Sequence, residues 1–116
     1  MRDDLAGQYS ILDVGDILRP DCFSSFRSVL HTSFKVALDE SDAELSLIEA
    51  KDTGSTPDYE RFSLLFSGPL EPFLPQQIYL FRHPQLGELH LFTVPVGKNP
   101  DGFLYEVVFS RPLAAE

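Results

Sequence analysis

This chain of 116 residues has a single cysteine, no tryptophan and no long hydrophobic run. The single cysteine, Cys22, excludes an internal disulfide bond and any zinc site that needs several cysteines. No apolar run approaches the roughly 20 residues that a membrane span requires. Residues 1–4 lack the apolar core of a secretory signal. We therefore expect a cytoplasmic protein with no membrane partner.

Basic residues are also scarce, because nine lysines and arginines stand against 18 aspartates and glutamates. The resulting net charge of -9 repels phosphate backbones, and the basic residues are scattered along the chain. The composition therefore predicts that nucleic acid is not a partner.

The length and the hydrophobic fraction of 43% fit one folded domain. Residues 1–19 show no sustained hydrophobic period, and we expect them to form a loosely ordered arm before a single antiparallel β domain at 20–116. From Pro20, apolar residues fall near one face of a helix, so the pattern predicts a short amphipathic helix that ends near His31.

Beyond the helix, apolar residues alternate with polar ones, and turn residues separate the alternating segments. The expected strands are 32–38, 44–51, 61–66, 77–82, 88–96 and 103–110. The alternation breaks at Ile48, which suggests a β-bulge. The segment 68–75 contains three prolines, so we expect it to cross the surface rather than to join the sheet interior. The predicted fold is mainly β: a small antiparallel barrel or sandwich of about six strands with one short N-terminal helix.

Symmetric turns between the last three strands would fix which residues face each other. This assumption places Arg82 opposite Glu88, Leu80 opposite His90 and Ile78 opposite Phe92, and it places Val94 opposite Tyr105 and Phe92 opposite Val107. One face of these strands is then predicted to be core, and a ladder of charged residues, Arg82, Glu88 and Arg111, lies at its edge.

The opposite face of the same strands is also apolar, which a solvated face would not be. Either the helix or a closed barrel covers it, or it is a contact surface for another chain. The residues of this candidate interface are Tyr79, Phe81, Leu89, Leu91, Leu104 and Val108.

Chemistry-bearing residues form no recognisable catalytic or metal-binding motif. His90 and Glu88 share a strand face, but no third ligand follows at a metal-binding spacing, and His83 is expected to be structural. Cys22 lies on the apolar side of the predicted helix and reads as a small buried residue. We therefore assign no catalytic residue, metal or cofactor, and keep a trio of Glu88, His90 and Glu106 as a minor enzyme alternative.

Several blocks of the sequence, taken in order, are similar to a known family. They are Phe62 to Pro69, Leu74 to Tyr79, His83 to Gly87, Leu91 to Gly97 and Tyr105 to Phe109. The chain resembles small bacterial proteins of a family known only as a domain of unknown function, number 6916, over roughly Phe23 to Phe109. Members tend to have glycine near the position of His31, where we expect a left-handed helix stop. The resemblance implies no catalytic residues, and members near phage-tail-like collar genes imply a structural or accessory role.

The leading hypothesis is a noncatalytic domain that works through protein contacts, as a self-associating or accessory subunit of a larger assembly. A small-molecule binding β barrel is the first alternative, because phenylalanine is abundant. An enzyme with an unrecognised acid/base site is the second.

Overall fold

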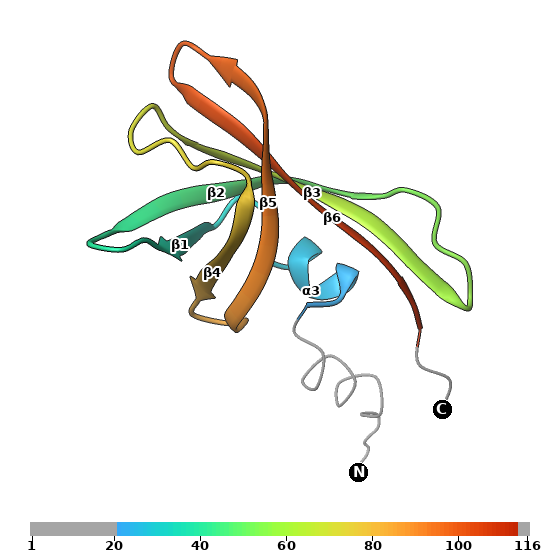
Figure 1. The fold of residues 1–116 in the computed structure, drawn as a ribbon. Helices are drawn as coiled ribbons and strands as arrows, with labels where there is room; N and C mark the ends of the chain where they lie inside the picture. The colour runs from blue at the N-terminus through green and yellow to red at the C-terminus, as the bar shows by residue number, and fades with distance from the viewer. Residues whose placement is uncertain (1–20, 114–116) are drawn as a thin grey trace.

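The computed structural model describes residues 21–113, so the expected arm at 1–19 lies outside the described residues. Its strands form one closed antiparallel barrel in the order β1-β2-β3-β6-β5-β4 (Figure 1). The mainly β prediction with six strands and one short helix is confirmed. The bounds are α3 Phe23–Arg27, β1 Ser33–Ala37, β2 Asp42–Asp52, β3 Tyr59–Pro69, β4 Gln77–His83, β5 Gly87–Asn99 and β6 Gly102–Pro112.

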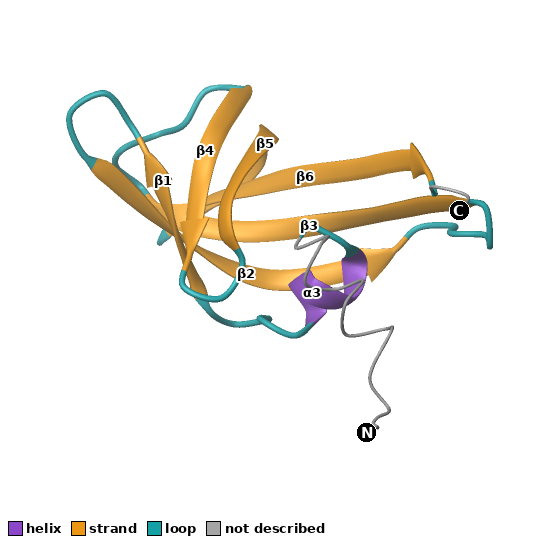
Figure 2. Cartoon of the chain, turned by 90° about the horizontal axis from the view of Figure 1, so that it is seen from below, coloured by secondary structure: helices purple, strands orange, loops and turns teal. Residues whose placement is uncertain are grey.

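The longest ladder joins β3 to β6, from Tyr59 opposite Pro112 to Pro69 opposite Gly102. These two long strands run side by side in Figure 2. Their inner faces supply Phe62, Phe66 and Tyr105, which are fully buried. Side chains on alternate positions of one face pack together, so this ribbon provides one wall of the core.

The helix α3 is shorter than the predicted one, which was to run from Pro20 to about His31. After Arg27 the backbone bonds tighten, because the N–H groups of Val29 and Leu30 donate to carbonyls three residues back. Phe26 lies within 6.5 Å of the rings of Phe34, Phe62 and Phe109. The apolar face that the sequence predicted is therefore present and packs against the inner side of the sheet, with α3 next to β2 and β3 (Figure 2).

His31 takes the left-handed corner that follows this helix, with a φ of 68°. A β-carbon makes this region costly, and glycine avoids that cost. The N–H of His31 donates to the carbonyl of Leu47 at 2.7 Å, and the N–H of Leu47 donates to Thr32 at 3.0 Å. These bonds attach the corner to β2. The expected left-handed conformation at His31 is confirmed, but it does not stop the helix, which ends at Arg27 with Ser28 in the right-handed conformation.

Two register predictions are confirmed. Pairing of β2 with β3 shifts between Leu47 and Glu49, which places the bulge at Ile48. In the β4–β5 hairpin, Arg82 lies opposite Glu88, Leu80 opposite His90 and Ile78 opposite Phe92.

The predicted register between β5 and β6 is wrong by one residue. Val94 lies opposite Glu106 and not Tyr105, and the pairing shifts again between Pro95 and Gly97. Two features explain the difference. The turn contains only Pro100 and Asp101, because the Asn99 side chain accepts hydrogen bonds from the N–H groups of Asp101 and Gly102, both at 2.9 Å. Val96 is then the extra residue of a bulge.

The expected ladder of Arg82, Glu88 and Arg111 is only half correct. Arg82 pairs with Glu88 at 3.1 Å, whereas Arg111 pairs with Glu60 at 3.1 Å and with Asp21 at 2.9 Å. Arg111 loses hydration here, but hydrogen bonds to the two carboxylates outweigh that loss and raise its pKa. Because Glu60 also accepts the N–H of Phe23, this cluster fixes the start of α3.

The segment with three prolines also differs from expectation, because Gly68 and Pro69 belong to β3 and pair with Phe103 and Gly102. Pairing of β2 with β3 ends at Ser67, so Pro69 lies at a strand end that needs no second partner. The loop between β3 and β4 then runs from Leu70 to Gln76 and contains the cis bond before Pro72.

Gly102 is the position where β6 approaches β3 most closely, since a β-carbon there would overlap the carbonyl oxygen of Gly68. We expect Gly102→Ala to lower the free energy of unfolding by about 2 kcal/mol, because the backbone must move to accept the methyl group. Gly97→Ala in the same hairpin is the control, since its β-carbon meets only Leu104 at an ordinary 3.4 Å. Urea denaturation of both variants measures the difference, and equal stabilities would contradict the close approach.

Candidate interaction surface

Aromatic side chains fill the interior of the barrel. The rings of Phe34, Phe66 and Phe81 lie 5.2 to 6.2 Å apart and are fully buried. Leu74 from the β3–β4 loop is also buried, and its N–H donates to the hydroxyl of Tyr105 at 3.0 Å. A lumen occupied by protein side chains gives no support to the small-molecule binding alternative.

Four of the six candidate interface residues belong to this interior. Tyr79, Phe81, Leu89 and Leu91 are 0 to 8% exposed, so they do not form an open surface. Burial raises the pKa of Tyr79, whose hydroxyl donates to the carbonyl of Pro75 at 2.5 Å. The structure therefore does not bring the six residues together on one face.

The outer face of β4, β5 and β6 carries the exposed apolar side chains instead. Ile78 and Phe92 are directly opposite each other and are 62% and 49% exposed. Leu80 and Val94 extend this surface along the same two strands and are partly buried. Val108 on β6, one of the two remaining candidate residues, is 62% exposed, and Leu104, the other, is half-buried. We call Ile78, Leu80, Phe92, Val94 and Val108 the outer apolar patch.

Charged residues lie at two ends of this patch. At one end, β1 meets β4, and Lys35 lies directly opposite Arg82. Arg82 is paired with Glu88, while Lys35 makes no ion pair with any residue of 21–113, although Glu44 lies opposite it on β2. At the other end, Glu106 lies between Val94 and Leu65. Its side chain too has no hydrogen bond or ion pair within the described part of the chain.

A groove of about 580 Å³ runs beside the junction of β1 and β4, lined by Lys35, Arg82, His83 and Pro84, among others. His83 is buried there, and its Nδ1 accepts the N–H of Gln85 at 3.0 Å. Its Nε2 lies 2.9 Å from the hydroxyl of Thr32, which donates to the carbonyl of Val29. This network assigns the Nε2–H tautomer, and burial lowers the pKa of His83. The structural role expected for His83 is consistent with these bonds.

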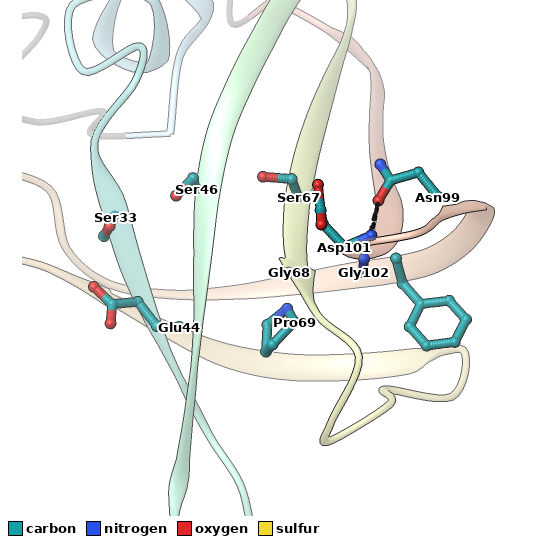
Figure 3. Close-up of a pocket in the computed structure, with 10 residues that line it drawn as sticks. Ser33, Glu44, Ser46, Ser67, Gly68, Pro69, Asn99, Asp101 and Gly102 are labelled. Carbon is teal, nitrogen blue, oxygen red and sulfur yellow. Dashed lines mark hydrogen bonds between the residues drawn. The ribbon is translucent and has the colours of Figure 1, made fainter.

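A second groove of about 580 Å³ lies between the β1–β2 hairpin and the β5–β6 turn (Figure 3). Its polar side chains include Glu44 and Ser46 on β2, Ser67 on β3 and Asp101 in the β5–β6 turn. Glu44 and Asp101 are exposed, and no group of three metal-ligating side chains occurs among residues 21–113. Nothing in this groove supplies an activated nucleophile or base.

The trio of Glu88, His90 and Glu106 does not converge. His90 lies opposite Leu80, and Glu106 lies opposite Val94, four residues further along β5. That spacing separates the two positions by about 13 Å along the strand. Glu88 is already paired with Arg82. The trio therefore offers no support for the enzyme alternative.

Comparison with known proteins supplies a family and no activity. A family model described as a domain of unknown function, DUF6916, matches residues 22–109. The chain belongs to this family. No curated protein and no solved structure matches the chain. The DUF6916 match covers α3, all of β1 to β5, and β6 as far as Phe109. No helix among residues 21–113 is long and apolar enough to cross a membrane.

Leu91 and Phe92 are neighbours that face opposite sides of this DUF6916 barrel. Leu91 is 3% exposed, so we expect Leu91→Asp to cost about 3 kcal/mol or more and to unfold much of the protein, since it buries an unpaired charge. Phe92→Asp should leave the fold intact, because the new carboxylate lies in solvent. Circular dichroism melting of both variants distinguishes the two faces. Loss of folding in Phe92→Asp, or a normal melt in Leu91→Asp, would contradict this orientation.

His83 should make stability depend on pH. Because its folded pKa lies below the ordinary 6.5, the unfolded chain binds the proton more readily as pH falls below about 6.5. The contribution of neutral His83 to the free energy of unfolding is therefore complete above that pH. It is lost progressively as pH falls towards the folded pKa. Urea denaturation between about pH 7 and pH 5 should show this loss.

Asparagine at position 83 is the matched test, because its side-chain oxygen can still accept the N–H of Gln85 but does not titrate. We expect His83→Asn to flatten the pH dependence at little cost above pH 7. His83→Leu, which removes both hydrogen bonds, should be less stable at every pH, and its stability should vary with pH as little as that of His83→Asn. If the stability of His83→Asn changed with pH as steeply as that of the wild type, the pH dependence would come from other groups.

Proposed function

We propose that this domain is a noncatalytic protein-interaction module, which acts as a self-associating or accessory subunit of a larger assembly of the phage-tail-like kind. The observation that carries the proposal is the outer apolar patch, centred on the facing pair Ile78 and Phe92. A large contiguous apolar patch on a protein surface is typical of a site of protein contact. The cytoplasmic location remains a prediction.

The composition of the patch fits a contact surface. Aromatic side chains are typical of interface centres, while charged residues are depleted there. The central residues Ile78, Leu80 and Phe92 carry no charge, and the ion pair of Arg82 with Glu88 lies at the edge. On a chain of net charge -9, this wall of the barrel carries few of the acidic residues that would repel an acidic partner.

A photo-crosslinking amino acid at position 92 tests the proposal. We expect Phe92→p-benzoylphenylalanine, expressed in the source cells, to form a protein adduct of defined mass, because a contact surface holds its partner within reach of the probe. Gel mobility and mass spectrometry measure the adduct. Its mass shows whether the partner is a second copy or another protein.

Two variants make the result specific. The same probe at exposed Lys51, on β2 and thus across the barrel from β5, should give no such adduct. Adding Ile78→Asp beside the probe should abolish the adduct of position 92, since it places a charge at the centre of the patch. Equal crosslinking from both positions, or none from position 92, would overturn the proposed function.

A further inference from the structure

We propose that His83 latches the barrel closed between β1 and β4, and that protonation of its ring opens this seam while the other strands stay paired. The inference is independent of the outer apolar patch. Between β1 and β4 only two residue pairs are in register, Lys35 with Arg82 and Val36 with Phe81. Every other ladder of the barrel has at least five such pairs. The seam between β1 and β4 is therefore the part of the barrel with the least backbone pairing.

The sequence explains why this ladder is short. One step beyond the pair of Lys35 and Arg82, His83 is level with Phe34, and the residue that follows β4 is Pro84. Proline has no N–H to donate to a neighbouring strand, so backbone pairing does not continue through it. Side chains must therefore hold the two strands together at this end of the seam.

The ring of His83 makes that connection. Its centroid lies 4.5 Å from that of Phe34 on β1. Its Nε2 lies 2.9 Å from the hydroxyl of Thr32, which donates its own hydrogen to the carbonyl of Val29. Nε2 therefore carries a hydrogen and donates it across the seam. Nδ1 accepts the N–H of Gln85 at 3.0 Å, in the turn that leads to β5.

A proton added to this ring breaks the arrangement. It binds to Nδ1, because Nε2 already carries a hydrogen, and two donors then face each other at the N–H of Gln85. Burial also disfavours the charged ring and lowers the pKa of His83. The charged ring is relieved when it moves out into water. That movement releases Thr32 and Phe34 together, so the two strands keep only their two backbone pairs.

The charged groups beside the ring offer it no compensation. Those that line the adjoining groove are Lys35 on β1, Glu44 on β2, Arg82 on β4 and Glu88 on β5, and their formal charges cancel. Arg82 and Glu88 are already paired at 3.1 Å. The segment between α3 and β1 meets the ring through a hydroxyl group, which carries no charge. Within residues 21–113 no carboxylate accepts a hydrogen bond from His83, so the protonated ring is better solvated outside the closed seam.

Hydrogen exchange of the full chain, followed by mass spectrometry at about pH 7 and about pH 5.5, tests the inference. Segments 32–38 and 78–84 report the seam, while 60–68 and 103–110 report the β3–β6 ribbon, after correction for the intrinsic effect of pH on exchange. The open seam restores the ordinary pKa of 6.5 to His83. We therefore expect exchange in the seam to rise severalfold, up to about tenfold, at the lower pH, with the ribbon unchanged.

Histidine variants show whether this ring is the group that titrates. His83→Asn keeps an acceptor for the N–H of Gln85 but binds no proton, so its seam should exchange at the same corrected rate at both pH values. His90→Asn is the matched control, because His90 is exposed on β5, and it should respond to acid as the wild type does. Circular dichroism melting confirms that each variant is folded.

A disulfide bond across the seam distinguishes opening of this seam from unfolding of the whole barrel. Positions 35 and 82 are directly opposite each other, with β-carbons about 5 Å apart, so Lys35→Cys together with Arg82→Cys can form the bond. Cys22→Ser in the same chain removes the native thiol. We expect the oxidised form to lose the acid-induced exchange in the seam and the reduced form to retain it.

Four results would overturn the inference. The first is a seam whose exchange does not rise in acid, and the second is a ribbon that loses protection as much as the seam does. The third is an acid response that persists in His83→Asn, which would assign it to another group. The fourth is a response that persists in the oxidised double-cysteine form, which would place the opening elsewhere in the barrel.

Discussion

The side chain of Asn99 holds the turn between β5 and β6, and this turn sets which residues of the two strands lie opposite each other. By accepting the N–H groups of Asp101 and Gly102, it limits the turn to Pro100 and Asp101. The bulge at Val96 then brings Val94 opposite Glu106. Because side chains alternate, a shift of one residue would turn a whole strand inside out. The turn therefore fixes which residues of β6 lie opposite β5 between Val94 and Asn99.

Features that arise from short stretches of chain could be predicted from the sequence. The break in alternation at Ile48 locates a bulge, and the turn from Pro84 to Leu86 sets the register of Arg82 with Glu88. The β5–β6 register could not be predicted in this way, because the turn is tighter than its composition suggests and an unpaired residue, Val96, precedes it in β5. The helix was predicted too long for a related reason: the N–H of His31 donates to Leu47, a residue 16 positions away. Such a partner leaves no signal in the local pattern.

The candidate surface shows more clearly that a local pattern does not predict long-range contacts. The sequence shows correctly that both faces of the last strands are apolar, but alternation alone does not reveal which face is inside. That choice comes from closure of the barrel, through Val36 opposite Phe81, and from Phe26 and Leu74, which cover its ends. The predicted core residues Ile78 and Phe92 therefore lie outside, and the predicted interface residues Phe81 and Leu91 lie inside. Of the two alternatives for the predicted interface face, the structure shows the closed barrel, which covers Phe81 and Leu91, while other residues form the exposed apolar face.

Electrostatics then determine how an acidic barrel can use such a face. Repulsion between copies of charge -9 weakens with salt, since charges further apart than about 8 Å are screened at physiological ionic strength. The apolar contribution of Ile78, Leu80 and Phe92 does not weaken in this way. Rising salt therefore reduces the general repulsion between copies and leaves the apolar contribution unchanged, so the apolar side chains, and not charge pairs, supply the affinity of a contact through this patch.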